Sequence, residues 1–224
     1  MVVPTRQRLD RDAVIDAAMS ISRSTPEQSP QPVTGATLGR ALSVDRSAVW
    51  RHFVDKNDLL RACGDRLLEP AVAGAERLED PWDRIVAIFE GVVESYRRHP
   101  LLASEAMTLL FWGRSWRRLA EVVVSSLNDL GLQPEDAARF SHLLMELTTS
   151  HATSLALYEG RPPRERELEF QLTLADLKTI DPVEYPHLAA AGPLISKIDQ
   201  QQVTGMIISS FRIAVEHTRA RETT

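Results

Sequence analysis

Apolar residues recur at three- and four-residue intervals along most of the chain, which is the spacing of one face of an α-helix. Between these stretches stand Pro, Gly and Asp residues of the kind that end one helix or begin the next. The pattern predicts nine or ten helices and shows no convincing segment with the two-residue period of a strand. We therefore expect an all-α fold.

The breaks between helices set the predicted boundaries. The segment 24–32 holds three prolines and no apolar residue, so we expect a loop there. Thr34 and Asp45 are predicted N-caps of two short helices, which are joined by a turn at Ser43 and Val44. The helices are predicted over residues 10–23, 35–42, 46–53, 56–78, 81–98, 100–112, 115–130, 134–159 and 199–219, and two shorter segments, 165–178 and 183–191, have a weaker helical pattern.

Residues 34–56 have the pattern of a helix-turn-helix unit, because two short helices flank a turn of a few residues. Gly39 and Ala48 are small where the two helices cross. The apolar positions are those that such a unit buries: Leu38, Leu42, Val44, Val49 and Phe53. The exposed face of the second helix keeps Arg46, Ser47, Trp50 and Arg51. An arginine there can reach guanine O6 and N7 in the major groove, and nearby N–H groups suit phosphate oxygens.

This region resembles the tetracycline-repressor (TetR) family of one-component transcriptional regulators. The resemblance covers residues 8–60 and rests on VIDAA at 14–18, on the Thr before the unit, and on the ending WRHFVDK at 50–56, followed by NDLL. The family usually has Tyr in place of Trp50 and Gly in place of Ser43. Ser43 therefore predicts either a turn without a left-handed residue or a mildly strained one. The segment 181–188 also looks like the stretch before the last helix in some members.

The resemblance implies a role for each matching position. Base reading would fall to Arg46, Ser47, Ala48 and Arg51, and phosphate contact to Thr34, Trp50, His52 and Lys56. Arg51 suits either role. Two of these positions have a plainer interpretation, since Trp50 also fits a core residue and Lys56 a surface charge.

The resemblance further implies two domains, a helix-turn-helix DNA-binding domain over 1–60 and a helical ligand-sensing and dimerisation domain over 61–224. Aromatic and Met side chains with a few polar groups would line a pocket for a small, largely apolar molecule. These residues are Trp82, Phe89, Met107, Phe111, Trp112, Trp116, Met145, Thr149 and His151. The alternative is that the apolar ones simply form the core.

The predicted helices over 134–159 and 199–219 carry more apolar and small positions than one buried face needs. Two such helices from each of two chains would make a four-helix bundle, so we expect a homodimer. The alternative is that the surplus lies inside the monomer.

Charge and composition narrow the function. The net charge of −5 over 224 residues excludes a uniformly basic nucleic-acid binder, but residues 1–62 carry nine basic and seven acidic side chains, a local charge of +2. A single Cys excludes an intramolecular disulfide. With no apolar run long enough to span a bilayer and no signal peptide, we expect a soluble cytoplasmic protein.

Enzyme chemistry finds little support in the sequence. His142 and Glu146 form only half of a metal site, and Glu184 with His187 occurs once where a carboxylate bundle needs two such pairs. Phosphate-binding Gly loops and nucleophile elbows are missing from the sequence. We expect a regulator without cofactor or metal, acting as a repressor that a ligand releases from a palindromic operator. The alternative is a helical adaptor or ligand-binding protein without sequence-specific DNA binding.

Overall fold

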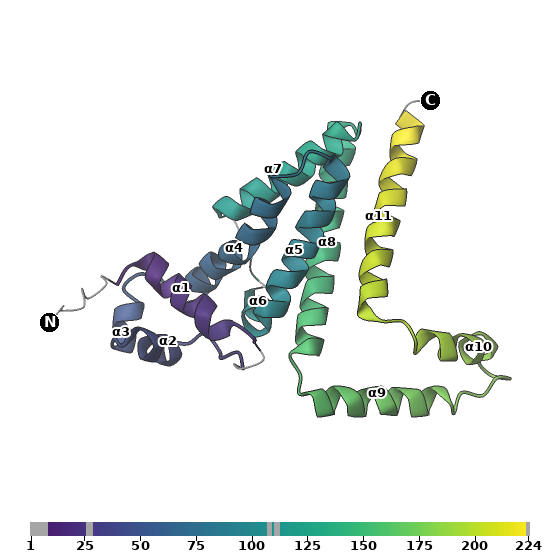
Figure 1. Cartoon of the computed structure of the whole chain (residues 1–224), viewed down its shortest axis with the longest axis horizontal. Helices are drawn as coiled ribbons and strands as arrows, with labels where there is room; N and C mark the ends of the chain where they lie inside the picture. Colours follow the sequence, from purple (N-terminus) through teal and green to yellow (C-terminus); the bar gives the residue numbers. More distant parts are fainter. Residues whose placement is uncertain (1–8, 26–28, 107–108, 110–112, 223–224) are drawn as a thin grey trace.

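The computed structural model describes residues 9–25, 29–106, 109 and 113–222, and its regular structure in these ranges is helical (Figure 1). None of the helices within these ranges is long and apolar enough to cross a membrane. The helices described are α1 Arg11–Ser22, α2 Gly35–Leu42, α3 Arg46–Val49, α4 Lys56–Ala75, α5 Pro81–Arg98, α6 Pro100–Ala106, α7 Arg114–Asp129, α8 Pro134–Glu159, α9 Pro163–Leu177, α10 Pro186–Ile195 and α11 Gln200–Glu222.

Helices α1, α2 and α3 pack around a small apolar core that includes Val14, Leu38, Val49 and Phe53, all buried as the pattern predicts. α3 is shorter than predicted, because it ends at Val49 rather than Phe53. The chain turns after Val49 and brings the Phe53 ring into the core. The guanidinium of Arg11 lies 4.2 Å from the centre of that ring. Burial of Phe53 therefore takes precedence over helix propagation here.

The turn between α2 and α3 is a left-handed one built without glycine. Ser43 has φ 55° and ψ 41°, so the strained alternative is the correct one. Gly39 supplies the close approach that this turn requires, because a Cβ at that position would lie 2.9 Å from the carbonyl oxygen of Val44. The two short helices are thus held at a fixed angle by backbone contact.

Helices α4 to α8 form the body of the protein. The predicted domain boundary at residue 60 falls inside α4, which continues unbroken from the first residue after the helix-turn-helix unit to Ala75. α4 crosses α5 closely at Gly91, where a Cβ would meet the Cα of Ala71 at 2.7 Å. The core between the helices contains the fully buried rings of Phe89 and Tyr96.

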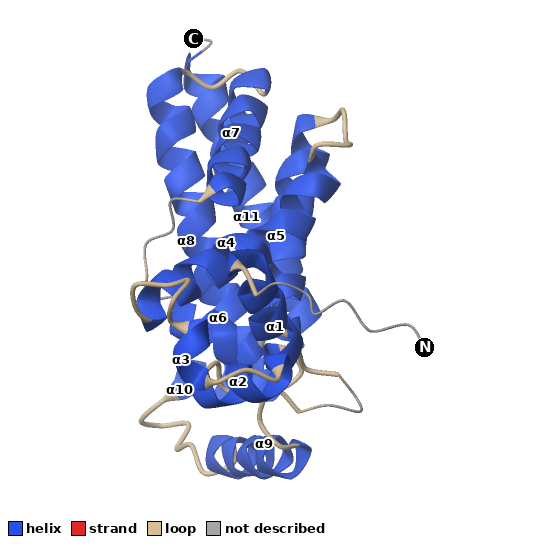
Figure 2. Ribbon diagram, turned by 90° about the vertical axis from the view of Figure 1, so that its left-hand side faces the viewer, coloured by secondary structure: helices blue, strands red, loops and turns tan. Residues whose placement is uncertain are grey.

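Beyond α8 the chain leaves the body. Helices α9 and α10 extend from the end of α8, and α11 then returns alongside α8 (Figure 1); Figure 2 shows α9 at the foot of the molecule. All residues of α9 are described, and none of them is buried. We call residues 161–199 the arm. Its two helices touch each other where Gly192 meets Leu177.

Candidate nucleic-acid interface and ligand site

The first turns of α2 and α3 are capped as the sequence predicts. Thr34 and Thr37 form a reciprocal capping box, in which the Thr34 hydroxyl accepts from the Thr37 amide at 3.1 Å and the Thr37 hydroxyl accepts from the Thr34 amide at 3.0 Å. Asp45 accepts from the Ser47 amide at 2.7 Å. Hydrogen bonds from the Ser47 hydroxyl and amide hold the pKa of the Asp45 carboxyl below its ordinary value. The caps fix where both helices begin.

The outward face of α3 carries the residues predicted to read bases. Arg46 and Ser47 are exposed, Ala48 is half-buried, and Arg51 is exposed just beyond the end of the helix. Two guanidinium groups therefore lie at the surface on either side of a small side chain. This face has the donors that bidentate contact with guanine requires.

Trp50 and His52 are both half-buried, and Trp50 lies beside the start of α2. The indole Nε1 of Trp50 lies 2.7 Å from the place where a Cβ of Gly35 would be, so the ring lies against the first residue of α2. The main-chain oxygen of His52 accepts from the Arg11 guanidinium at 2.8 Å. Trp50 thus packs against the core and still places its N–H near the capped N-terminus of α2.

The first turn of α4 is held by a side-chain cap and by ion pairs with α1 and α6. Asp55 caps the helix by accepting from the Asp58 amide at 2.7 Å. Arg11 of α1 pairs with Asp58 at 2.7 Å, and this hydrogen bond holds the pKa of the Asp58 carboxyl below its ordinary value. Lys56 is the first residue of α4, and its ammonium nitrogen lies 2.8 Å from Oε2 of Glu105 in α6. The sequence alone did not reveal this partner, 49 residues away.

Two of the predicted ligand-pocket residues meet inside the body. The rings of Phe89 in α5 and His151 in α8 stack with their centres 5.9 Å apart. His151 Nε2 lies 2.9 Å from the hydroxyl of Thr204 in α11, and partial burial lowers the pKa of this imidazole. Phe89 is fully buried and His151 half-buried. The pair joins three helices.

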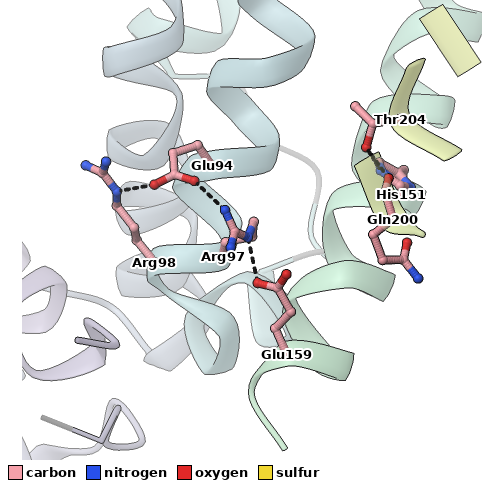
Figure 3. A network of polar contacts seen from close by, with 7 residues as sticks. All are labelled: Glu94, Arg97, Arg98, His151, Glu159, Gln200 and Thr204. Carbon is pink, nitrogen blue, oxygen red and sulfur yellow. Dashed lines mark hydrogen bonds and ion pairs between the residues drawn. The ribbon is translucent and has the colours of Figure 1, made fainter. Parts of the chain in front are cut away.

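A hollow of about 480 Å³ opens beside this pair, and its polar walls come from residues that the sequence did not single out (Figure 3). Arg97 lies between two carboxylates, 2.6 Å from Glu159 and 3.0 Å from Glu94. Thr204 belongs both to this wall and to the hydrogen bond with His151. Charged positions on an amphipathic helix normally face solvent, so no sequence signal distinguished these residues from an ordinary surface.

The other described residues of the predicted pocket are spread over α5, α7 and α8. Trp82 is half-buried two turns before Phe89 on α5, and the Arg212 guanidinium lies 5.1 Å from its ring centre. Trp116 lies in the first turn of α7, and Met145 and Thr149 are half-buried on α8. The Thr149 hydroxyl donates to the Met145 carbonyl at 2.8 Å. The remaining three predicted residues, Met107, Phe111 and Trp112, lie outside the described residues.

Asp65 is a further structural residue that the sequence did not indicate. Its carboxylate, on α4, accepts from the amides of Ser115 and Trp116 at 3.2 and 2.9 Å and so caps α7. Gly113 fits against it without room for a side chain. In the described part of the chain, no three His, Cys, Asp or Glu side chains gather as a metal site.

Solved structures with this arrangement of helices come from the TetR family. No protein-family model and no curated protein matches the sequence. A TetR transcriptional regulator of Streptomyces coelicolor is 21% identical, with a TM-score of 0.76 over 94% of this chain and 99% of that one. A transcriptional regulator from Streptomyces coelicolor A3(2) is 24% identical, with a TM-score of 0.74 over 94% and 98%. ActR of Streptomyces coelicolor, solved in complex with actinorhodin, is 16% identical, with a TM-score of 0.77 over 93% and 96%.

These similarities extend over nearly the full length of both chains. The chain therefore has the TetR-family fold, with an N-terminal helix-turn-helix unit and a larger helical part behind it. At 16 to 24% identity the similarity concerns the fold, so the function is argued below from the residues themselves.

Proposed function

We propose that this protein is a transcriptional regulator that binds DNA through α2 and α3. The observation that carries the proposal is the outward face of α3, where Arg46 and Arg51 are exposed within a capped helix-turn-helix unit. A capped, rigid unit can present these guanidinium groups to base edges. The TetR-family fold supports the same function, since one of the similar solved structures is a TetR transcriptional regulator.

In this proposal, base recognition and phosphate contact are carried out by different residues. Arg46, Ser47, Ala48 and Arg51 contact base edges, and Thr34, Trp50, His52 and Lys56 contact phosphates. One α3 spans only a few base pairs. The operator is therefore an inverted repeat, with half-site centres about 34–36 Å or a multiple of that distance apart.

The experiment begins with genome-wide mapping of bound DNA, which supplies the operator for binding assays with purified protein. Arg46→Ala should lose discrimination at particular base pairs by about 1–3 kcal/mol. Lys56→Ala should weaken binding to every sequence alike and flatten the salt dependence by about one unit of slope for each phosphate that is no longer neutralised. Arg77→Ala, an exposed basic residue just beyond the end of α4, is the matched control and should bind like the wild type.

Two outcomes would count against this assignment. If Lys56→Ala changes base preference and Arg46→Ala does not, the two roles are reversed. A protein that fails to shift any mapped fragment in a salt-dependent manner supports the alternative of a helical adaptor or ligand-binding protein.

A homodimer is part of the proposal, and the exposed apolar surface supports it. Leu143 on α8 and Met206 and Ile213 on α11 are 42%, 61% and 67% exposed. An apolar groove of about 460 Å³ lies between the two helices. Leu144, Thr148 and Phe211 are buried within the chain, so only part of the apolar surplus on these helices belongs to the monomer interior. A second copy would cover the rest.

The arm extends the same apolar surface. Large apolar side chains are exposed along both of its helices and in the segment between them: Leu168, Phe170, Leu172, Val183, Tyr185, Leu188, Leu194 and Ile195. A 15-residue helix is marginal in water unless it packs against something. Since α9 buries none of its described residues against its own chain, the second copy is the partner that fits it.

The proposed regulator responds to a small, largely apolar ligand that binds near the stacked rings of Phe89 and His151. Thr204, whose hydroxyl lies near His151 Nε2 in Figure 3, also lines the hollow described above. ActR, with the same fold, has been solved with actinorhodin. An apolar compound that binds here should raise the melting temperature and release the operator. His151→Ala should still bind the operator and lose the release. A screen in which no compound shifts the melting temperature would contradict the proposal.

A further inference from the structure

The ion pair between Lys56 and Glu105 connects the helix-turn-helix unit to the body. Lys56 starts α4 directly after the unit, and Glu105 lies in the last turn of α6. The Lys56 side chain is 46% exposed and the Glu105 side chain 33% exposed, and Oε2 of Glu105, the atom that faces the ammonium, is itself buried. The lysine side chain is therefore partly exposed, whereas the carboxylate oxygen that it contacts is buried.

A DNA phosphate and this carboxylate compete for the same ammonium group. Lysine is a compact point charge, and its attraction to either anion falls off with distance. At 2.8 Å from Oε2, the ammonium is committed to Glu105 in the described structure. Contact with a phosphate then requires that the side chain leave the carboxylate or share its charge with it.

Arg11, the other basic residue in an ion pair at the first turn of α4, has a different partner. Arg11 pairs with Asp58, which lies in the first turn of α4 as Lys56 does, so that pair joins α1 to α4. Lys56 instead reaches across to α6, which packs against α4, α8 and α1. The position of α6 in the body thus decides how near the carboxylate stands to the lysine.

We propose that Glu105 acts as an internal competitor for the operator by holding Lys56 away from the DNA backbone. This inference rests on the proposed function, in which Lys56 contacts phosphate, and adds a regulatory residue to it. A shift of α6 toward α4 weakens DNA binding, and a shift away strengthens it, without any change in the base-reading face of α3.

The test compares operator affinity, by fluorescence anisotropy over a range of salt concentrations, for full-length wild type, Glu105→Gln, Lys56→Gln and the double variant. A dimer holds two Lys56–Glu105 ion pairs, and Glu105→Gln removes both. The substitution should therefore tighten operator binding roughly two- to thirty-fold. The gain should vanish in the Lys56→Gln background. Glu105→Asp keeps the charge and shortens the side chain, and should give part of the gain.

Glu121→Gln, an exposed position on α7, removes the same charge elsewhere and should leave the affinity unchanged. Thermal melting of each variant checks that it is folded, and the Glu105→Asp result stands in if Glu105→Gln melts early. Equal tightening with and without Lys56 would show simple charge repulsion and overturn the proposal, as would weaker or unchanged binding in Glu105→Gln. If wild type itself binds no operator, it is the proposed function that fails.

Discussion

His99 fastens the DNA-binding helices to the end of α5. Its ring is 8% exposed, and Nδ1 lies 3.0 Å from the hydroxyl of Ser22 at the end of α1. Beside it, the carbonyl of Arg98 accepts from the Ser24 amide at 2.7 Å. Burial, followed by the charges of Arg23 and Arg98, lowers the pKa of His99 to about 4. The imidazole is therefore neutral near pH 7.

This residue should make the protein less stable in mild acid. Between pH 6.5 and 4 the unfolded chain binds a proton at His99 that the folded chain does not, so the free energy of unfolding falls as the pH falls. The loss reaches at most about 3 kcal/mol and is complete below about pH 4. Urea unfolding of wild type and His99→Gln between about pH 7.5 and 4.5 measures it. His142→Gln, at an exposed position, should keep the wild-type profile. Coinciding profiles for wild type and His99→Gln would refute the assignment.

Contacts between near neighbours in the chain could be predicted from the sequence, and contacts across the fold could not. The caps Thr34, Asp45 and Asp55 lie within three residues of the amides that they accept from. Lys56 was predicted by its place in a motif, but its partner Glu105 was not. Helical periodicity says which face a residue occupies and leaves open which distant helix meets that face.

Glycine sets how closely α4 and α5 approach each other. Gly91 faces Ala71, and an added methyl group would lie 2.7 Å from both its Cα and its Cβ. Gly74, also on α4, has no atom within 4 Å of its would-be Cβ among the described residues. Two glycines in adjoining helices therefore stand in opposite environments.

Alanine substitution at these two glycines should change the free energy of unfolding in opposite directions. Gly91→Ala should destabilise the protein by about 1–3 kcal/mol, because the clash involves backbone atoms that cannot move away cheaply. Gly74→Ala should stabilise it by up to about 1 kcal/mol through helix propensity alone. Chemical denaturation at one pH measures both. A Gly91→Ala protein as stable as Gly74→Ala would mean that the two helices are not packed as described.

Helix boundaries followed the sequence at some local signals but not at all of them. α6, predicted to reach residue 112, ends at Ala106, and α10, predicted over 183–191, runs over Pro186–Ile195. α5 and α8 begin at Pro81 and Pro134 and end at Arg98 and Glu159 as predicted. α3 did not, since the burial of Phe53 ends it early. A proline sets the start of its own helix through local backbone geometry. The Phe53 ring instead ends α3 because it is buried in a core that α1 also forms.

The arrangement of two chains leads to a prediction about assembly. Ile213→Lys, on the exposed apolar face of α11, should leave the monomer fold intact and prevent a second copy from covering that face. Sedimentation should then show a monomer at micromolar concentration. Val54→Lys replaces another exposed apolar side chain, outside this face, and should remain dimeric. A monomeric wild type would remove the homodimer from the proposal.

The sequence predicted a surplus of apolar positions on α8 and α11 without dividing it between interior and interface. In the structure, Phe211 is buried inside the monomer and Met206 is exposed on its surface. The arm was predicted as two helices, but its separation from the body was not. Each of its helices has an ordinary composition, and only the packed structure reveals that nothing in the described part of the chain buries α9.

The uncovered α9 bears on how long a single subunit would survive in a cell. A helix with no buried side chain among its described residues opens at little free-energy cost, and proteases cut where a chain opens locally. A subunit without a partner would be cut in the arm first, while assembly would shield the same segment. The rate of turnover would then depend on the concentration of the protein, so that surplus unpaired chains are cleared and paired ones persist.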